Sequence, residues 1–427
     1  LTKKKKIIFS LSIPVLNDQK ISNSLLLIQS GKIIYSVQKK MLPNYGVFDE
    51  KRYFSPRQKP QEYFKFKNKK IEFLICEDMW SEDFMEDKID KDVDLIVVIN
   101  ASPYEIGKFE LRKKLASERA KYFKSELVYV NLVGSQDELI FDGGSFAMNQ
   151  SGEIILQENF FKESEMVFDL DKRAVNKKIR KINKFEHLYR ALMLALKNYM
   201  SKNGFKYAHL GLSGGIDSAL TLAIIADTIK TKNISTFFLP SKYSSKGSKI
   251  DAQRLSKNVG IKISEISIEM LRINVLKHLK PVFKNIKEDI TEENIQSRLR
   301  GLILMAISNK FNSLLITTGN KSELAVGYST LYGDMCGGYS LLKDVYKTDV
   351  FELCEWRNNN ILGDFNIKKT NIIPKEIIIK EPSAELRFDQ KDSDSLPPYD
   401  ILDKILSLLI DENRDLKFVT QKGISEN

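Results

Sequence analysis

Hydrophobic positions in the first part of the chain form short runs separated by turns. Six of these runs predict strands, because their apolar residues alternate with polar ones or continue unbroken for a few residues. They are KKIIFSLSIPV, NSLLLIQ, KIIYSV, KIEFLIC, VDLIVVIN and ELVYVNLVG. Between the last two, KFELRKKLASERAKYFKS has helical spacing, and DGGSFAMNQSGEIILQENFF then predicts a hairpin that turns at NQSG.

The second part follows a different order, in which strands and helices take turns. A helix is expected in HLYRALMLALKNYMSKNG, and the strand YAHLGLSG comes after it. Further strands are expected in STFFLP, ISEISI and SLLITTG, with helices over 218–231, 250–259 and 292–311 between or before them. Strands that alternate with helices in this way predict a doubly wound parallel sheet and an α/β fold class.

The change of pattern divides the chain into three parts. We expect one domain over residues 1–168, a charged connector over 169–185 and a second domain over 186–427. A length of 427 residues suits two domains, and 42% apolar residues supply enough material for their cores.

Composition excludes several classes of protein. Three cysteines without a CxxC pair, and only three histidines, argue against a disulfide framework or a structural zinc site. No apolar run is long enough to span a membrane, and no signal-peptide pattern opens the chain. These features lead us to expect a cytoplasmic protein.

The net charge of +11 falls almost wholly on the residues after position 168. A basic surface suits nucleic acid or a polyphosphate ligand such as a nucleotide. The lysines are scattered among acidic residues, however, and solvated surface lysine explains the charge equally well. Charge alone therefore leaves these interpretations open.

The segment HLGLSGGIDSALTLAII contains the most informative loop in the chain. A buried strand ends at Leu212, a tight loop runs from Ser213 to Ser218, and a helix begins at once. Two glycines let the backbone approach an anion, the serines add hydroxyl donors, and the helix start offers free N–H groups. Asp217 would repel a bare phosphate, so we expect it to hold Mg²⁺ there. The Walker loop and the GxGxxG motif are absent, and a capped strand-to-helix turn without function is the alternative.

SGGIDS resembles the signature of ATP pyrophosphatases, which cleave ATP to AMP and pyrophosphate while they activate a substrate oxygen. Longer runs closely resemble the synthetase domain of glutamine-dependent NAD synthetases over residues 185–420. They are LPSKYSSKGSKIDAQRLSKNVGI, EENIQSRLRGLILMAISNKFNSLLITTGNKSELAVGYSTLYGDMCGGYSLLKDVYKT and KEPSAELRFDQKDSDSLPPYDILD. The resemblance implies an adenine nucleotide α-hydrolase-like fold for this part of the chain.

Site residues follow from position and from the resemblance together. Thr318 and Glu323 come directly after a buried strand, at the edge where open α/β sheets bind ligands. Alone, Lys347 would be interpreted as a surface lysine, and Cys336 and Cys354 as buried small apolar residues. The resemblance implies ATP contacts from Gly211, Leu212, Ser213, Gly214, Gly215, Ile216, Asp217, Ser218, Thr318, Lys347 and Ser383, deamido-NAD contacts from Asn294 and Glu323, and Mg²⁺ ligation by Asp217 and Glu323.

KIEFLICEDMW places Cys76 at the end of an apolar strand, where a cysteine alone is most often a core residue. Three other features accompany it: Lys39 before an LPNY turn, the segment VINASPYEIGKFELR and the segment NLVGSQDELIFDGGSF. Together these features resemble the nitrilase-type glutaminase domain that is fused to NAD synthetases. The resemblance implies part of a nitrilase-like α-β-β-α sandwich. The Cys76 thiolate would attack the glutamine amide in an electropositive site, and Lys39 would stabilise the oxyanion. By the same resemblance, the glutamine pocket is lined by Tyr45, Trp80 and Ser102.

In this family a glutamate upstream of the lysine completes the catalytic set. No such residue precedes Lys39. We therefore expect that part of the glutaminase domain precedes residue 1, that the family's C-terminal segment follows Asn427, and that the chain alone does not hydrolyse glutamine.

The resemblance implies the last step of NAD synthesis. Deamido-NAD would be adenylated by ATP with release of pyrophosphate, and ammonia from glutamine would displace AMP. ATP, Mg²⁺ and an oligomer formed through the synthetase domain are implied, without nucleic acid or membrane. The alternatives are a tRNA-thiolating ATP pyrophosphatase, which needs cysteines beside the phosphate loop, a simple nitrilase-type amidase, and a remnant without catalytic function.

Overall fold

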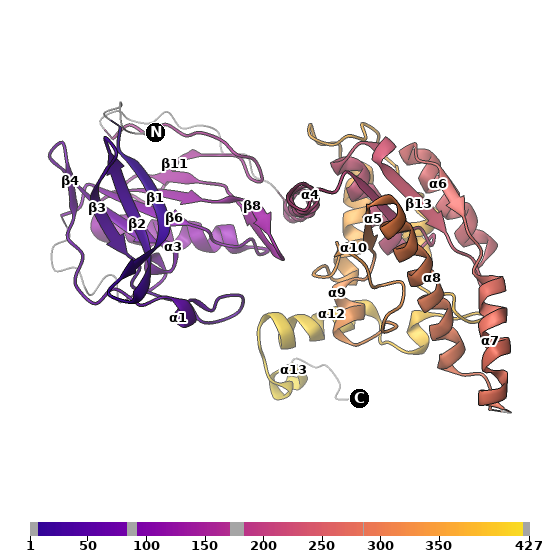
Figure 1. The fold of residues 1–427 in the computed structure, drawn as a ribbon. Coiled ribbons are helices and arrows are strands. Elements are labelled where there is room, and N and C mark those ends of the chain that lie inside the picture. Colours follow the sequence, from indigo (N-terminus) through magenta and orange to yellow (C-terminus); the bar gives the residue numbers. More distant parts are fainter. Residues whose placement is uncertain (1–6, 83–91, 171–182, 285, 422–427) are drawn as a thin grey trace. The chain divides into compact units, whose positions relative to one another are not determined.

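The computed structural model describes residues 7–82, 92–170, 183–284 and 286–421 (Figure 1). The chain divides into two compact units, Leu1–His187 and Leu188–Asn427. Most of the connector that we expected at 169–185 lies outside the described residues. No described helix is long and apolar enough to cross a membrane.

The first unit contains two main sheets. An antiparallel sheet has the order β1-β2-β3, and a six-stranded sheet has the order β11-β10-β7-β6-β5-β4. The six predicted strands are confirmed as β1, β2, β3, β5, β6 and β7, and the predicted hairpin as β10 and β11. The elements are β1 (Phe9–Asn17), β2 (Lys20–Gln29), β3 (Lys32–Gln38), α1 (Glu50–Tyr53), β4 (Phe64–Phe66), β5 (Lys69–Ile75), η1 (Cys76–Met79), β6 (Leu95–Asn100), α3 (Lys108–Phe123), β7 (Glu126–Asn131), β8 (Val133–Gln136), β9 (Leu139–Asp142), β10 (Phe146–Met148) and β11 (Ile154–Gln157).

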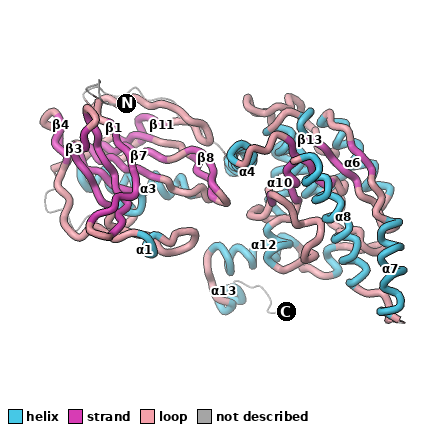
Figure 2. The backbone as a smooth tube through the Cα atoms, viewed as in Figure 1, coloured by secondary structure: helices cyan, strands magenta, loops and turns pink. Residues whose placement is uncertain are grey.

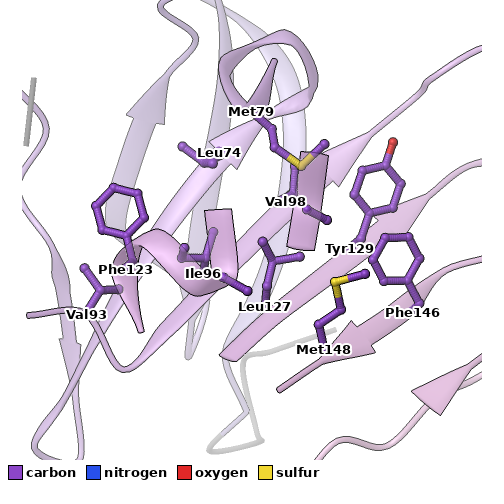
Figure 3. Close-up of a cluster of buried hydrophobic side chains, with 12 residues drawn as sticks. Leu74, Met79, Val93, Ile96, Val98, Phe123, Leu127, Tyr129, Phe146 and Met148 are labelled. Atoms are coloured by element: carbon purple, nitrogen blue, oxygen red, sulfur yellow. The ribbon is translucent and has the colours of Figure 1, made fainter. Parts of the chain in front are cut away.

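Strand β5 explains how the layers of this unit pack. Its Leu74 belongs to a core that also contains Ala120 and Phe123 of helix α3, part of which Figure 3 shows. Its Phe73 and Ile75 point to the other face and pack with leucines of β2. Because the end of β5 is buried on both faces, Phe73, Leu74 and Ile75 follow one another as an unbroken apolar run.

Helix α3 and the two sheets form three layers, which agrees with the predicted partial α-β-β-α sandwich. The outer face of the three-stranded sheet carries exposed apolar side chains. Phe9 is 42% exposed and Leu11 is 41% exposed, and they lie opposite Ile28 and Leu26 in the register of β1 and β2.

The second unit is built on one sheet of five parallel strands in the order β14-β13-β12-β15-β16, with helices packed around it (Figure 2). The predicted doubly wound parallel sheet is confirmed. The elements are α4 (Lys184–Lys202), β12 (Tyr207–Gly211), α5 (Ile216–Thr228), η2 (Thr231–Asn233), β13 (Ile234–Phe238), α6 (Lys246–Val259), β14 (Ile263–Glu265), α7 (Glu269–Phe283), α8 (Ile290–Phe311), β15 (Ser313–Thr317), α9 (Lys321–Ala325), β16 (Tyr339–Ser340), α10 (Lys347–Asn359), α11 (Lys375–Ile379), η3 (Asp392–Asp394), α12 (Tyr399–Leu406), the π-helical turn η4 (Ser407–Asp411) and α13 (Leu416–Gln421).

Helix α7 was not predicted from the sequence. It buries only Arg272 and contains Pro281, so it lacks the apolar stripe that marks a helix against a core.

A buried ion pair fixes α10 against α5. Arg357 Nε lies 2.5 Å from Asp227 Oδ2, and Tyr189 of α4 donates its hydroxyl to the same oxygen at 2.7 Å. Both charged side chains are fully buried, and buried charges are tolerated only when they are paired and hydrogen-bonded. The pair therefore sets the position of α10, whose first residue is Lys347.

His209 lies fully buried on β12, in the middle of the parallel sheet. Its Nε2 is 3.0 Å from the carbonyl oxygen of Leu304, and its Nδ1 is 3.0 Å from the hydroxyl of Ser313. Because a carbonyl can only accept, Nε2 donates, and Nδ1 is free to accept from the serine in the neutral ring. Burial lowers the pKa of His209.

This lowered pKa predicts loss of stability in acid. As the pH falls below the value near 6.5 of an unfolded histidine, the unfolded chain binds a proton that the folded chain excludes. The contribution of His209 is at most about 1.4 kcal/mol per pH unit. In urea unfolding between pH 7 and pH 5, His209→Gln should flatten the dependence of the unfolding free energy on pH. His278→Gln, which changes an exposed histidine on α7, should not; equal slopes for the two variants would contradict the prediction.

Candidate active sites

The loop between β12 and α5 has the shape that anion binding requires. Gly214 has a φ of +85°, and a Cβ placed there would lie 2.2 Å from the carbonyl oxygen of Ser248, so only glycine fits. Ser213 Oγ accepts from the Gly215 N–H at 3.2 Å and lies 3.1 Å from Ser218 Oγ. These bonds fix the loop in place before any ligand arrives.

Side chains from the first turns of three helices meet beside this loop. Lys347, at the start of α10, places Nζ 2.6 Å from Asp217 Oδ2 of α5 and 2.9 Å from Glu323 Oε1 of α9. Lys347 is 1% exposed. The ammonium group is therefore held between two carboxylates that lie about a hundred residues apart in the sequence.

Burial and charge shift the pKa values in this cluster. Burial, together with the negative charge of Asp217, raises the pKa of Glu323 to about 7 although Lys347 opposes the shift. Burial disfavours the ammonium of Lys347, yet Asp217 and Glu323 outweigh this effect and raise its pKa. Two close carboxylates thus leave an excess of negative charge around one lysine.

Asn320 connects two members of this cluster and was missed in the sequence. Its Nδ2 donates to Asp217 Oδ1 at 2.9 Å, and its Oδ1 accepts from the Glu323 N–H at 3.0 Å and so caps α9. It is fully buried. An asparagine immediately before a helix, as in TTGNKSE, is a capping signal that could have identified it.

A cavity of about 340 Å³ opens over the loop and the lysine cluster. It is wide enough for a nucleotide-sized ligand, since small-molecule sites commonly span about 300–1,000 Å³. The lining includes these predicted residues: Gly211, Leu212, Ser213, Gly215, Ile216, Asp217, Ser218, Asn294, Thr318, Glu323, Lys347 and Ser383. Gly214 is not in the lining, because it packs against the backbone of Ser248.

Asn294 and Ser383, which also line the cavity, have hydrogen-bond partners as well. Asn294 Oδ1 accepts from Thr330 Oγ1 at 2.7 Å. Ser383 donates its hydroxyl to the carbonyl oxygen of Gln390 at 2.5 Å and accepts from the Glu385 N–H. No cysteine lines the cavity in the described part of the chain, so the cysteines that a tRNA-thiolating enzyme needs are not found there.

The donor set beside the loop suits Mg²⁺. Among the described residues no group of three acidic, histidine or cysteine side chains could hold a metal alone. Mg²⁺, however, is commonly held by one or two carboxylates together with substrate phosphates. Asp217 and Glu323 supply two carboxylates. Burial and then the charge of Asp217 raise the pKa of Glu323, and a bound cation would offset that charge.

In the first unit, Cys76 begins η1 directly after β5. Its φ of +50° is unusual for a residue with a side chain, and such backbone strain is concentrated at functional sites. Asp78 fixes this turn, because its carboxylate accepts from the N–H groups of Ile75, Lys40 and Met41 at 3.2, 3.0 and 2.8 Å. The same carboxylate therefore holds the segment that carries Lys39 beside Cys76.

Lys39 is 1% exposed and pairs with a residue that the sequence did not indicate. Its Nζ lies 2.6 Å from Oε1 of Glu50, which begins α1. The resemblance implies a glutamate upstream of Lys39. Glu50 lies downstream, and its role depends on the fold of the 41–50 segment, which no local pattern predicts.

The expectation of an electropositive site for Cys76 was wrong for the described residues. Burial raises the pKa of the Cys76 thiol to about 11, and Glu77, Glu50 and Asp78 raise it further while Lys39 lowers it. One ammonium group therefore faces three carboxylates. The thiol is neutral at pH 7 in this arrangement.

The predicted glutamine pocket is only partly assembled around Cys76. Tyr45 is exposed and donates its hydroxyl to Glu77 Oε1 at 2.8 Å. Trp80 is half-buried, and Lys108 Nζ lies 5.1 Å from the centre of its ring.

Ser102 is buried and takes part in a different network. Its backbone N–H donates to Asn131 Oδ1, and its hydroxyl accepts from Arg112 Nε at 3.1 Å. Arg112 also pairs with Asp142 at 2.7 Å, and both of these side chains are fully buried. The hydroxyl of Ser102 is thus held by a structural arginine.

The two other cysteines differ from each other. Cys354 is buried on α10, as predicted. The prediction that Cys336 is buried was wrong, because this residue lies exposed in the loop between α9 and β16. Neighbouring glycines at 337 and 338, and not Cys336, pack against β15.

Known proteins resemble the chain over nearly its whole length. Two family models match it, NAD synthase over residues 188–427 and carbon-nitrogen hydrolase over residues 1–179. The glutamine-dependent NAD(+) synthetase of Acinetobacter baylyi is 44% identical over 408 residues, which cover 95% of this chain and 74% of that protein. The corresponding synthetase of Thermotoga maritima is 40% identical over 445 residues, which cover 95% and 76%.

A solved structure gives the same result. The glutamine-dependent NAD+ synthetase from Acinetobacter baumannii, in complex with adenosine diphosphate, matches with a TM-score of 0.84 and 40% identity. The match covers 99% of this chain and 77% of that chain.

The charges around Cys76 predict how its reactivity responds to substitution. Lys39→Met removes the cation that lowers the thiol pKa and should slow alkylation, whereas Glu50→Gln removes a carboxylate that raises it and should speed alkylation. We expect changes of roughly 3- to 10-fold in opposite directions, because one pKa unit changes the thiolate fraction tenfold below the pKa.

The measurement is iodoacetamide modification of Cys76, followed by mass spectrometry from pH 7 to pH 10 in a Cys336→Ser background. Lys51→Met changes an exposed lysine beside Glu50 and serves as the control. Changes in the same direction for both test variants would contradict the assignment of these charges.

Proposed function

The chain belongs to the family of glutamine-dependent NAD(+) synthetases, and from that premise we propose how its own residues carry the reaction. These enzymes are ligases that catalyse the final step of NAD biosynthesis, with glutamine as the amido donor and ATP as a substrate. The proposal assigns adenylation of deamido-NAD to the second unit and release of ammonia to the first.

The observation that carries the first assignment is the position of Lys347 between Asp217 and Glu323, beside the phosphate loop. The backbone N–H groups at the start of α5, with the Ser213 and Ser218 hydroxyls, bind phosphate oxygens of ATP. Lys347 neutralises charge that develops on the phosphates as the nicotinate carboxylate attacks. Adenylation makes that oxygen a good leaving group, which ammonia then displaces.

Asp217 and Glu323 are the residues that would hold Mg²⁺. When bound, the ion supplies positive charge that offsets the charge of the phosphates. Asn294 and Thr330 lie in the part of the cavity lined by α8, and we assign them to the binding of deamido-NAD.

Adenylation should depend on both carboxylates. Asp217→Asn and Glu323→Gln should each lower the rate of pyrophosphate release with ammonia as nitrogen source by at least about 10²-fold, since each removes a carboxylate charge that holds the Lys347 ammonium beside the loop. The measurement is pyrophosphate release in the presence of ATP and deamido-NAD. Glu355→Gln, an exposed carboxylate on α10, is the control. Release at the parent rate by either test variant would refute the role of that residue.

For the first unit, we assign Cys76 as the nucleophile that attacks the glutamine amide. Lys39 stabilises the resulting oxyanion, and its pairing with Glu50 orients the ammonium group. Free glutamine carries an ammonium and a carboxylate at its α-carbon. Glu77 and Lys108 offer the complementary charges beside Tyr45 and Trp80, and we assign these four residues and Ser102 to the glutamine pocket.

Separate sites predict separable activities. Cys76→Ala should abolish any NAD formation that the chain supports with glutamine. The rate of NAD formation with ammonia should stay within about 3-fold of the parent rate, because that reaction does not use the proposed glutamine site. The control is Cys336→Ser, which should change neither rate. Equal loss of both activities in Cys76→Ala would show that Cys76 has a structural role instead.

We also assign an oligomer to the second unit, formed by a second copy of the chain. Exposed apolar side chains lie on α8 and on the loop that packs along it: Leu302, Met305, Leu331 and Tyr332 are 65%, 37%, 69% and 76% exposed. Arg300, which lines the cavity, precedes Leu302 by two residues and so lies on the opposite side of α8 from it. Exposed apolar groups of this kind mark association surfaces.

This surface can be tested by sedimentation. Leu302→Asp places a charge in the centre of the apolar group and should convert an oligomer into monomers at micromolar concentration. Leu416→Asp, on α13, changes a leucine that is equally exposed and should leave the oligomer intact. If both variants sediment like the parent, the surface on α8 is not the interface.

A further inference from the structure

Asp403 lies on α12 and is buried, with 5% of its surface exposed. Its Oδ1 accepts a hydrogen bond from Ser322 Oγ. Its Oδ2 accepts both from the backbone N–H of Thr348 and from Thr348 Oγ1, each at 2.8 Å. One carboxylate therefore satisfies donors from α9 and α10 at the same time.

These donors flank the two residues that face Asp217. Ser322 directly precedes Glu323, and Thr348 directly follows Lys347. Ser322 Oγ also accepts from the backbone N–H of Lys347 at 2.8 Å. Asp403, Ser322 and the first turn of α10 thus form one closed set of hydrogen bonds immediately behind the lysine cluster.

The carboxylate acts as the cap of a helix to which it does not belong. Tyr346, the residue before α10, makes no side-chain cap hydrogen bond. Without a partner, the N–H groups of the first turn would be buried and unsatisfied, which costs free energy. Asp403 supplies the acceptor from α12, and its negative charge suits the positive end of the α10 dipole.

Tyr399 lies one helical turn before Asp403, on the same face of α12. The centre of its ring is 5.2 Å from Lys347 Nζ, and its hydroxyl donates to Asp392 Oδ2 at 2.7 Å. This face of α12 therefore contacts the first turn of α10 at two points, the Lys347 side chain through Tyr399 and the Thr348 backbone through Asp403.

We propose that Asp403 is a positioning residue for adenylation, which holds α9 and α10 so that Glu323 and Lys347 meet Asp217. The proposal rests on the roles assigned above to Lys347 and Glu323. Asp403, Ser322 and Thr348 are not among the residues that line the cavity, so Asp403 acts through its two neighbours and not on the substrate. A shift of about 1 Å in a group that orients a reaction can cost about 10²-fold in rate.

The first experiment compares Asp403→Asn with Asp400→Asn in the 427-residue chain. Asp400 is exposed on the same helix and provides a matched loss of charge. In Asp403→Asn the side-chain amide has a single acceptor oxygen, whereas the carboxylate uses two. We expect the kcat for ammonia-dependent pyrophosphate release to fall about 10- to 100-fold, as is usual when a residue behind a reactive group is lost. The KM for deamido-NAD should stay within about 3-fold, because α8 binds that substrate; Asp400→Asn should match the parent.

A second set of variants separates positioning from general loss of structure. Ser322→Ala removes one hydroxyl and is expected to fold even if Asp403→Asn does not. If the two residues act together, the losses of Ser322→Ala and Asp403→Asn will not add in the double variant. The affinity for ADP is measured by calorimetry for the same two single variants and the double variant, because this measurement does not require turnover.

The outcomes are distinct. Pyrophosphate release by Asp403→Asn at the rate of Asp400→Asn, or losses that simply add, would overturn the proposal. So would an equal rise in KM for both substrates with a lowered melting temperature, which indicates a purely structural role. Lys347→Ala tests the underlying function. If this variant releases pyrophosphate at the parent rate, the assignment of Lys347 fails. If Lys347→Ala loses activity while Asp403→Asn keeps the parent rate, only the role of Asp403 is refuted.

Discussion

The second unit depends on compensation of one buried cation. Lys347 is almost inaccessible to water, and an ammonium group in that position is stable only because two carboxylates lie within 3 Å of it. Those carboxylates come from α5 and α9, whose starts are placed by the carboxyl ends of β12 and β15. The parallel sheet, the cap from Asn320 and the ion pair of Arg357 with Asp227 all maintain this one arrangement.

The first unit also contains a buried lysine, but fewer carboxylates are paired with it. Lys39 is as buried as Lys347, but it has one carboxylate partner, and the neighbouring group is a thiol. Burial, together with three carboxylates, raises the pKa of the Cys76 thiol in the described residues, so the proposed attack on glutamine needs a base to accept the thiol proton. In the proposed reaction, the buried lysine of the second unit lies beside an anionic leaving group and that of the first unit lies beside a nucleophile.

The sequence predicted those features that depend on neighbouring residues. The strands follow from apolar runs, and the phosphate loop follows from glycines and serines between a strand and a helix. The partnerships Lys39–Glu50, Asn320–Asp217 and Asp403–Thr348 join distant segments, and no local pattern reports them. Helix α7 lacks an apolar stripe, and Cys336 was misjudged because burial of an isolated cysteine depends on the fold around it.

The contacts of Asp403 also have a consequence for synthesis of the chain on the ribosome. The loop at 213–218 emerges early, but residues up to 392 line the cavity above it, and the backbone N–H of Thr348 in the first turn of α10 finds its acceptor at position 403. A nascent chain that ends before α12 has left the exit tunnel lacks this support for Lys347. Both the complete lining of the cavity and this support for Lys347 therefore require nearly complete translation of the second unit.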